Sequence, residues 1–225
     1  MLIQTQNLTK HYGDKTVVQQ LNLSIPQGQL VALLGPNGAG KSTTIKMLTG
    51  LLSPSEGSII FQGQQLSRSD YQRQLGVVFQ DSILDQDLTV GQNLLSRAKC
   101  YRNFEASQLD FLIQVFELES ILKQSYGTLS GGQRRRVDIA RALVHQPKFL
   151  ILDEPSTGLD IQTRNVIWDA LLRLRQEQGL TILLTTHYLE EVENADYVYI
   201  IDHGHLIAAD TVSQLKAQYA YDTLS

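Results

Sequence analysis

One short stretch constrains the fold of this chain more than any other. It is a glycine, four residues and then Gly-Lys-Ser, and it reads Gly35, Pro36, Asn37, Gly38, Ala39, Gly40, Lys41, Ser42, followed by Thr43. The apolar run at 30–34 just before it predicts a buried parallel strand. Residues 44–51 follow, with Ile45, Leu48 and Leu51 at helical spacing and Gly50 near the end, and they predict a helix. Strand, glycine-rich loop and helix in this order are typical of a phosphate-binding loop.

Such a loop suits a nucleoside triphosphate. Its glycines let successive backbone N–H groups turn toward phosphate oxygens, where side chains would obstruct them. The helix N-terminus adds a partial positive charge, and Lys41 adds a full one near the β and γ phosphates. Ser42 supplies a hydroxyl for Mg²⁺. The alternative is a plain glycine-rich turn between a strand and a helix.

Length, charge and cysteine content limit the class of protein. A chain of 225 residues can bury roughly 70% of its unfolded surface. Its net charge of −4 gives no basic footprint for nucleic acid. The single cysteine, Cys100, suits a reducing compartment, and the first ten residues lack the layout of a signal peptide. We therefore expect an intracellular chain that reaches a membrane only through another polypeptide.

The order of the patterns predicts an α/β core that carries a helical insert. Residues 1–30 contain alternating apolar and polar positions and turn signals, which predict antiparallel strands. Further strand-like apolar runs are found at 75–79, 149–152, 181–184 and 197–201. Between 89 and 124 the spacing becomes helical instead. A mostly helical segment between two groups of strands indicates a subdomain carried by the core.

A pair of acids follows the apolar run at 149–152. Asp153 and Glu154 would lie at the carboxyl end of a buried strand, where ligands bind in open α/β sheets. Asp153 is then placed to hold Mg²⁺, and Glu154 to take a proton from an attacking water or to orient it. The alternative is an ordinary strand exit with two solvated acids. A phosphate-binding loop in the same chain favours the catalytic interpretation.

A third motif is Leu129-Ser130-Gly131-Gly132-Gln133, which leads into three arginines at 134–136. Ser130 is a good N-cap, and Gln133 three residues later completes a capping-box pattern, so a helix begins here. The two glycines would let a ligand approach the helix N-terminus, which favours an anion. The alternative is a capped helix with a solvated arginine face.

With this third motif the chain resembles the ATP-binding subunits of ATP-binding-cassette (ABC) transporters. Leu-Ser-Gly-Gly-Gln between a Gly-Lys-Ser loop and an apolar strand ending in Asp-Glu is that family's signature, and the resemblance covers essentially the whole chain. It implies an α/β fold: a P-loop NTPase (RecA-like) core with an N-terminal antiparallel β-subdomain and a helical signature subdomain. The single ABC ATPase domain would span 1–225, with core and β-subdomain at 1–83 and 146–225 and the helical subdomain at 84–145.

The resemblance also implies roles for residues that spacing alone leaves open. Tyr12 matches the aromatic residue that stacks on adenine. Gln80 matches the glutamine that reaches Mg²⁺ and the attacking water, in a loop that contacts the transmembrane partner. His187 matches the switch histidine that contacts the γ-phosphate. Asp160 ends the loop 156–160, which matches the loop that communicates across a dimer.

ATP and Mg²⁺ are the cofactors that the resemblance implies. Two nucleotide domains of this family meet head to tail with two ATP molecules between them. The implied catalytic residues are Glu154, His187, Gln80 and Lys41, and the implied metal ligands are Ser42, Gln80 and Asp153. The residues implied to contact nucleotide across the two copies are Tyr12, Gly35, Pro36, Asn37, Gly38, Ala39, Gly40, Lys41, Ser42, Thr43, Ser130, Gly131, Gly132, Gln133 and Asp160.

The implied function is ATP hydrolysis that powers transport through a separate membrane permease, on the cytoplasmic face of the membrane. The arginine-rich continuation of the signature looks most like the branch that exports drugs, antibiotics or peptides, and we expect a homodimer. The alternatives are an importer subunit, an ABC ATPase of ribosomes or DNA, another phosphate-loop enzyme, and a regulatory module. The signature disfavours other phosphate-loop enzymes, and intact Glu154 and His187 disfavour a regulatory module. Gln92 and Asp138 stand where many relatives carry glutamate, at positions that are not catalytic.

Overall fold

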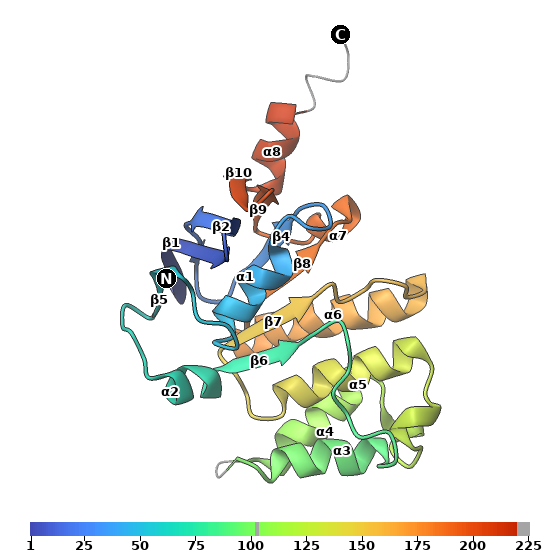
Figure 1. The fold of residues 1–225 in the computed structure, drawn as a ribbon. Coiled ribbons are helices and arrows are strands. Elements are labelled where there is room, and N and C mark those ends of the chain that lie inside the picture. The colour runs from blue at the N-terminus through green and yellow to red at the C-terminus, as the bar shows by residue number, and fades with distance from the viewer. Residues whose placement is uncertain (102–103, 220–225) are drawn as a thin grey trace.

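A computed structural model describes residues 1–101 and 104–219 of the chain. It contains two sheets (Figure 1). The first is antiparallel and is formed by β1 (Ile3–Tyr12), β2 (Lys15–Leu21), β3 (Ser24–Ile25) and β5 (Glu56–Phe61). The long strand β1 pairs with all three of the others, which confirms the expected N-terminal antiparallel sheet.

The second sheet has six strands in the order β10-β9-β4-β8-β7-β6. Its strands are β4 (Leu30–Leu34), β6 (Leu75–Val78), β7 (Phe149–Asp153), β8 (Thr181–Thr186), β9 (Tyr197–Asp202) and β10 (His205–Asp210). Only β10 is antiparallel to its neighbour. The loops after β4, β7 and β8 therefore leave the sheet at one edge, since the carboxyl ends of parallel strands lie together.

Helices cover the parallel sheet and extend beyond it. They are α1 (Lys41–Leu48), α2 (Arg68–Arg73), α3 (Val90–Ala98), α4 (Ala106–Val115), α5 (Gly131–Leu143), α6 (Ile161–Gln178), α7 (Leu189–Val192) and α8 (Val212–Tyr219), with 3-10 turns at Glu119–Ile121 and Tyr126–Thr128. Helices α3, α4 and α5 lie together below β6 (Figure 1).

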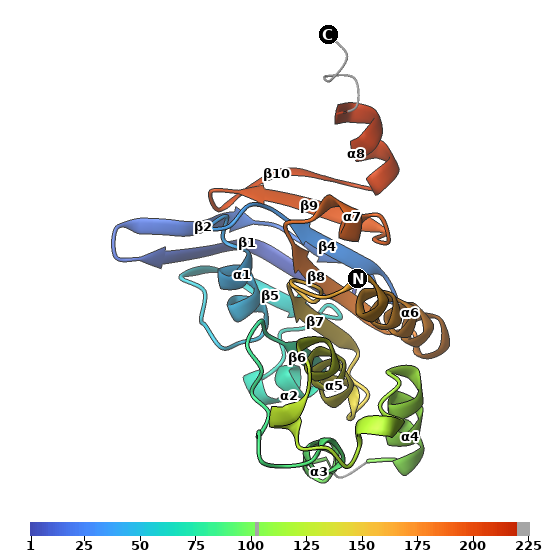
Figure 2. The same ribbon diagram turned by 90° about the vertical axis from the view of Figure 1, so that its right-hand side faces the viewer.

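Strand β4 is apolar at every position, and its packing shows why. Val31 and Leu33 pack on the side of the antiparallel sheet and α1, whereas Leu30 and Ala32 pack on the side of α5 and α6. Figure 2 shows α1 and α6 on opposite sides of this sheet. Both faces of the strand are buried, so no position is free to be polar.

The helix after the phosphate loop begins and ends three residues earlier than expected. It runs over Lys41–Leu48, because the loop turns directly into the first helical turn at Gly40, whose φ is 103°. Gly50 follows the helix with φ at +70° and turns the chain away. The expectation that Leu51 belongs to this helix and shares a face with Ile45 and Leu48 is therefore wrong: it lies beyond the helix, and 58% of it is exposed.

Candidate active site

A cavity of about 480 Å³ lies at the carboxyl edge of the parallel sheet. It is lined by Lys15, Val17, Asn37, Gly38, Gly40, Lys41, Ser42, Thr43, Gln80 and Glu154. Gly40 forms its tightest point: a Cβ there would lie 2.9 Å from the carbonyl oxygen of Val17, and its φ is one that other residues rarely adopt. The loop thus fits closely under the antiparallel sheet while its backbone lines the cavity.

Lys41 brings a buried positive charge to this cavity. Only 5% of the residue is exposed, and its Nζ donates to the carbonyl oxygens of Gly35 at 2.7 Å and Pro36 at 3.1 Å. The same Nζ lies 3.7 Å from Oε1 of Glu154. A buried ammonium at a helix N-terminus gives a strong site for an anion such as a triphosphate.

The acidic pair lies where strand β7 ends. Thr185, on the neighbouring strand β8, donates from Oγ1 to Oδ1 of Asp153 at 2.6 Å and accepts from the backbone N–H of Glu154 at 3.1 Å. Glu154 has φ at +47°, a conformation that costs a residue with a side chain about 1 kcal/mol or more and that clusters at functional sites. Its Oε1 lies 3.2 Å from Nδ1 of His187. Glu154 therefore lies between an ammonium and an imidazole.

Several expected site residues lie outside the cavity lining. Tyr12 is half exposed and pairs with Lys15 across the β1–β2 hairpin, which places it at the edge of the cavity. Asp153 is buried behind it. Asp160 caps α6, accepting from N–H and Oγ1 of Thr163 at 2.9 and 2.8 Å, and these hydrogen bonds lower its pKa.

We call residues 130–133 the signature tip. The tip starts α5 with the expected capping box: Ser130 Oγ accepts from the N–H of Gln133 at 3.2 Å, and the Gln133 side chain accepts from the N–H of Ser130 at 3.0 Å. A Cβ on Gly132 would lie 2.7 Å from Oγ1 of Thr163, so packing explains that glycine. A Cβ on Gly131 would meet nothing within 4 Å. Packing within the chain leaves Gly131 unexplained.

The arginine run is not a solvated face. Arg135 is 7% exposed, and its guanidinium donates to the carbonyl oxygens of Phe79 at 2.6 Å, Asp153 at 2.7 Å and Pro155 at 3.0 Å. Burial lowers the pKa of this arginine. The side chain ties α5 to the ends of β6 and β7. The sequence did contain an indication that Arg135 is buried, because Arg135 shares a helix face with the buried residue Ile139 one turn later.

Three further residues contribute to the candidate site but belong to none of the sequence motifs. Lys15 lines the cavity from a hairpin, Thr185 supports both acids, and Thr163 contacts both Asp160 and the space above Gly132. None belongs to a pattern with fixed spacing. Of the three, Thr185 was the easiest to find from the sequence, because it is a polar residue near the end of a strand that the sequence places at the ligand-binding edge.

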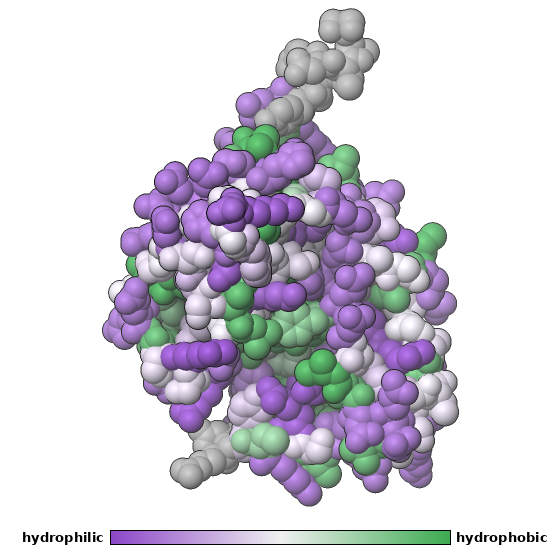
Figure 3. Space-filling view, viewed as in Figure 1, coloured by the Kyte–Doolittle hydropathy of each residue, from purple (hydrophilic) through white to green (hydrophobic). Residues whose placement is uncertain are grey.

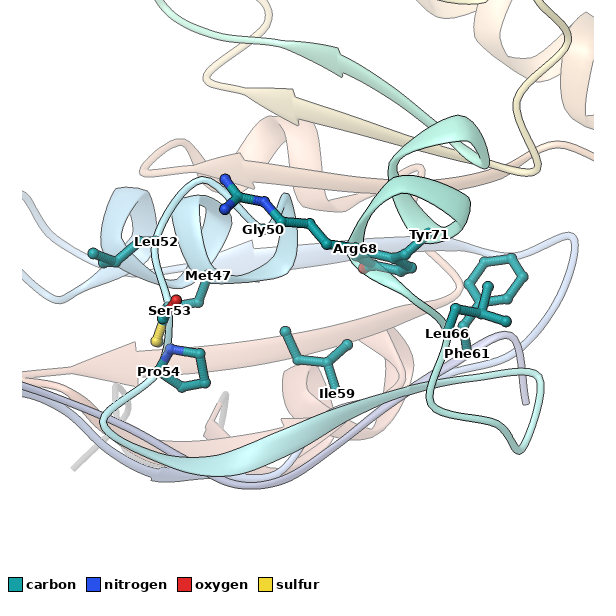
Figure 4. A pocket seen from close by; sticks show the side chains of 10 residues that line it. All are labelled: Met47, Gly50, Leu52, Ser53, Pro54, Ile59, Phe61, Leu66, Arg68 and Tyr71. Carbon is teal, nitrogen blue, oxygen red and sulfur yellow. The ribbon is translucent and has the colours of Figure 1, made fainter.

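A second hollow, of about 240 Å³, lies away from these groups (Figure 4). Phe61, Leu66 and Tyr71 lie at one end of it, and Met47 and Pro54 at the other. Its lining is mainly apolar and contains no carboxylate. The cavity around Lys41 and Glu154 therefore remains the candidate for polyphosphate chemistry.

Comparison with known proteins gives consistent matches over this chain. A protein-family model described as ABC transporter matches residues 18–157. The Nod factor export ATP-binding protein I of Burkholderia orbicola (strain AU 1054) is 46% identical over 216 residues, which cover 92% of this chain and 69% of that protein. The linearmycin resistance ATP-binding protein LnrL of Bacillus subtilis (strain 168) is 38% identical over 229 residues, which cover 99% of this chain and 73% of that protein.

Solved structures with a similar fold are also subunits or cassettes of ABC transporters. The ATP-binding subunit of an ABC transporter superposes with a TM-score of 0.88 at 29% identity, covering 100% of this chain and 96% of that one. A dimeric structure of MJ0796, a bacterial ABC transporter cassette, gives a TM-score of 0.83 at 28% identity, over 94% and 99% of the two chains. The same cassette was solved as a dimer bound to ADP and Pi, in a post-hydrolysis state, with a TM-score of 0.84.

Proposed function

Because this chain belongs to the ABC transporter family, we propose that it powers export through a separate membrane permease. It is an ATP-binding and ATP-hydrolysing subunit that uses Mg²⁺. Export is supported by relatives that are named for Nod factor export and for linearmycin resistance. From these names we propose that the cargo is a drug, an antibiotic or a peptide rather than a nutrient taken up by the cell.

One observation carries the catalytic proposal: Glu154 Oε1 lies 3.7 Å from Lys41 Nζ and 3.2 Å from His187 Nδ1. We assign Lys41 to the phosphates, where its charge offsets the charge that develops as the γ-phosphate leaves. Glu154 orients the attacking water and takes its proton. His187 holds the Glu154 carboxylate from the other side and contacts the γ-phosphate.

The residues present also fit a Mg²⁺ ion. Ser42 and Gln80 line the cavity with oxygen-bearing side chains, and Asp153 lies at the end of the adjoining strand. Oxygen ligands of this kind are those that Mg²⁺ prefers. A bound Mg²⁺ would neutralise phosphate charge. We assign these three residues to it, and Tyr12 to the adenine ring.

We propose that the signature tip completes the site of a second copy. Gly131 faces open space, so a neighbouring molecule can approach the helix N-terminus closely. The structural neighbour MJ0796 is dimeric, which supports a pair of copies, and we propose that the two meet head to tail. In this arrangement the helical segment 84–145 would act as the unit that presents the tip to the partner, with Asp160 beside it.

We propose that the permease docks beside Gln80, at the cytoplasmic face of the membrane. A hollow of about 280 Å³ lies there, lined by Leu51, Phe79, Ile83, Arg97 and Arg141 among others. Leu51 and Ile83 are 58% and 68% exposed. Figure 3 shows a largely polar face with apolar residues near its centre. Within the described ranges, every helix is too short or too polar to cross a bilayer.

The test measures phosphate release and transport separately. The purified chain should release phosphate from ATP and Mg²⁺, and Lys46→Ala, on the exposed side of α1, should serve as the unaffected control. Co-expressed with a candidate permease, the chain should co-purify with that membrane protein. ATP should then drive cargo into inside-out vesicles. ATP-dependent uptake into right-side-out vesicles would contradict export.

A further inference from the structure

Glu154 and His187 both lie beyond the paired residues of their strands. The last pair in register between β7 and β8 is Asp153 with Thr185. Strand β7 ends at this pair, and β8 ends one residue later at Thr186, which pairs with Leu34 of β4. Glu154 and His187 nevertheless meet at 3.2 Å. Contacts outside the strand ladder fix such loops, because positions after a strand end are otherwise more mobile. One of them is the hydrogen bond that the N–H of Glu154 donates to Oγ1 of Thr185 at 3.1 Å.

Glu191 makes such a contact. It lies in α7, one helical turn after His187, and its Oε1 accepts a hydrogen bond from Oγ of Ser156, two residues after Glu154. Glu191 and Ser156 are only 4% and 3% exposed. A buried hydrogen bond therefore links the loop that carries Glu154 to the short helix that follows His187.

This carboxyl group is poorly placed for stability. Its Oε2 is buried without a hydrogen-bond partner, and it forms no ion pair with any of the residues that the structure describes. Burial raises its pKa, and nearby polar and positive groups offset only part of that effect. The groups that face it are Thr186, Arg164, His187, Glu154 and, from α5, Arg135. Removing a carboxylate from water with one oxygen unpaired and with no ion pair costs free energy, so we look for its benefit in function.

We propose that Glu191 is a positioning residue for ATP hydrolysis. Its hydrogen bond to Ser156 keeps the Glu154 carboxylate and the His187 imidazole directed at the same phosphate. Since Glu191 is buried beside these groups rather than in the cavity lining, it acts on their geometry and leaves ATP binding to the phosphate loop. The proposal rests on the ATPase activity and is independent of cargo and direction.

The first test separates kcat from KM. Glu191→Ala should lower kcat for ATP hydrolysis about 100-fold, the size of effect expected when reacting groups are misplaced by about 1 Å, with KM for ATP unchanged. Glu191→Gln keeps an acceptor oxygen for Ser156 and should retain most of kcat. Glu190→Ala, on the exposed neighbour, is the matched control and should behave as wild type. A wild-type kcat in Glu191→Ala would overturn the proposal.

A double-mutant cycle identifies the contact itself. Ser156→Ala should reproduce the loss of kcat, and the double variant Ser156→Ala with Glu191→Ala should be no slower than the slower single variant. Effects that multiply would overturn the proposal. If Glu191→Ala does not fold, the test is made with Ser156→Ala instead. A wild-type kcat in Ser156→Ala would also overturn the proposal. A wild-type chain that released no phosphate would instead contradict the ATPase function.

Thermal unfolding against pH distinguishes positioning from support of the fold. The folded-state pKa of Glu191 is raised, so the ionised carboxylate costs stability above the ordinary pKa of glutamate, and this cost disappears as the pH falls below it. Glu191→Gln should therefore match or exceed the wild-type Tm at pH 8, and its advantage should shrink toward pH 4. A lower Tm at pH 8, together with a lost kcat, would indicate a purely structural residue.

Discussion

The two halves of the proposed nucleotide site are built differently. The phosphate-loop half is enclosed: Lys41 is 5% exposed, and Glu154 and His187 meet beside it. The signature tip is a helix start that satisfies its own capping bonds and presents Gly131 to open space. The comparison shows that one chain brings Lys41, Glu154 and His187 together by itself, whereas the contacts of the described residues give Gly131 no packing role. This difference is what the proposed contact of the tip with a second copy explains.

The largest expected effect is a loss of turnover when Glu154, in the enclosed half, is replaced. Glu154→Gln removes the proton acceptor while keeping the shape of the side chain, so turnover should fall about 10³-fold. ATP affinity should remain, because Lys41 and the loop backbone are intact. Steady-state phosphate release and ATP binding by fluorescence measure the two. Glu193→Gln, an exposed residue that pairs with Lys216, is the control. Normal turnover in Glu154→Gln would remove Glu154 from the chemistry.

The next effect tests binding in the same half. Lys41→Ala removes a buried charge at the cavity, and charged hydrogen bonds contribute about 1.5–3 kcal/mol, so ATP affinity should fall about 10- to 100-fold. Isothermal titration with ATP and Mg²⁺ gives the affinity. Lys46→Ala, on the exposed side of the same helix, should bind as wild type. Unchanged affinity in Lys41→Ala would contradict the phosphate role.

The open half should respond in the opposite way, losing activity without losing stability. Gly131→Ala replaces a glycine in α5 with a better helix former, so the Tm should stay level or rise. The added methyl occupies the space through which a second copy approaches, and turnover should fall about tenfold. Gly132→Ala is the contrast, since its Cβ would meet Thr163 at 2.7 Å and the Tm should fall. Full activity in Gly131→Ala would mean that nothing approaches the tip.

The smallest effect compares two equivalent caps. Ser130 and Thr89 both form capping boxes, at the starts of α5 and α3. Each substitution to alanine should cost about 1 kcal/mol, or roughly 2–4 °C in Tm. Only Ser130→Ala should also lower ATP hydrolysis, because we assign only that helix start to the phosphate of a second copy. Equal activity in the two variants would reduce the Ser130 cap to a structural role.

The sequence predicted the parts of the fold that local patterns determine. The positions of the apolar strands along the chain, the presence of a helix after the phosphate loop and the capping box at Ser130 each depend on residues within a few positions of one another. Asp153 and Glu154 could be placed at the ligand edge because a parallel strand has a defined carboxyl end.

The remainder depends on contacts between distant segments. Arg135 reaches Phe79, 56 residues away, and the bond between Ser156 and Glu191 spans 35 residues. No local spacing encodes such a contact, so the sequence left a solvated arginine face open as the alternative. The predicted end of α1 was also wrong. Gly50, with its positive φ, turns the chain after the helix, so Leu51 does not lie on the helix face that its spacing predicted.

The central claim is that one copy's phosphate loop and the other copy's signature tip hold the same ATP. The most direct measurement mixes Lys41→Ala chains with Ser130→Glu chains, in which the added carboxylate repels phosphate. A mixed dimer then has one site with both defects and one site with neither. With mixed dimers isolated by two different affinity tags, phosphate release should rise well above that of either parent. Mixed dimers no more active than their parents would contradict the account.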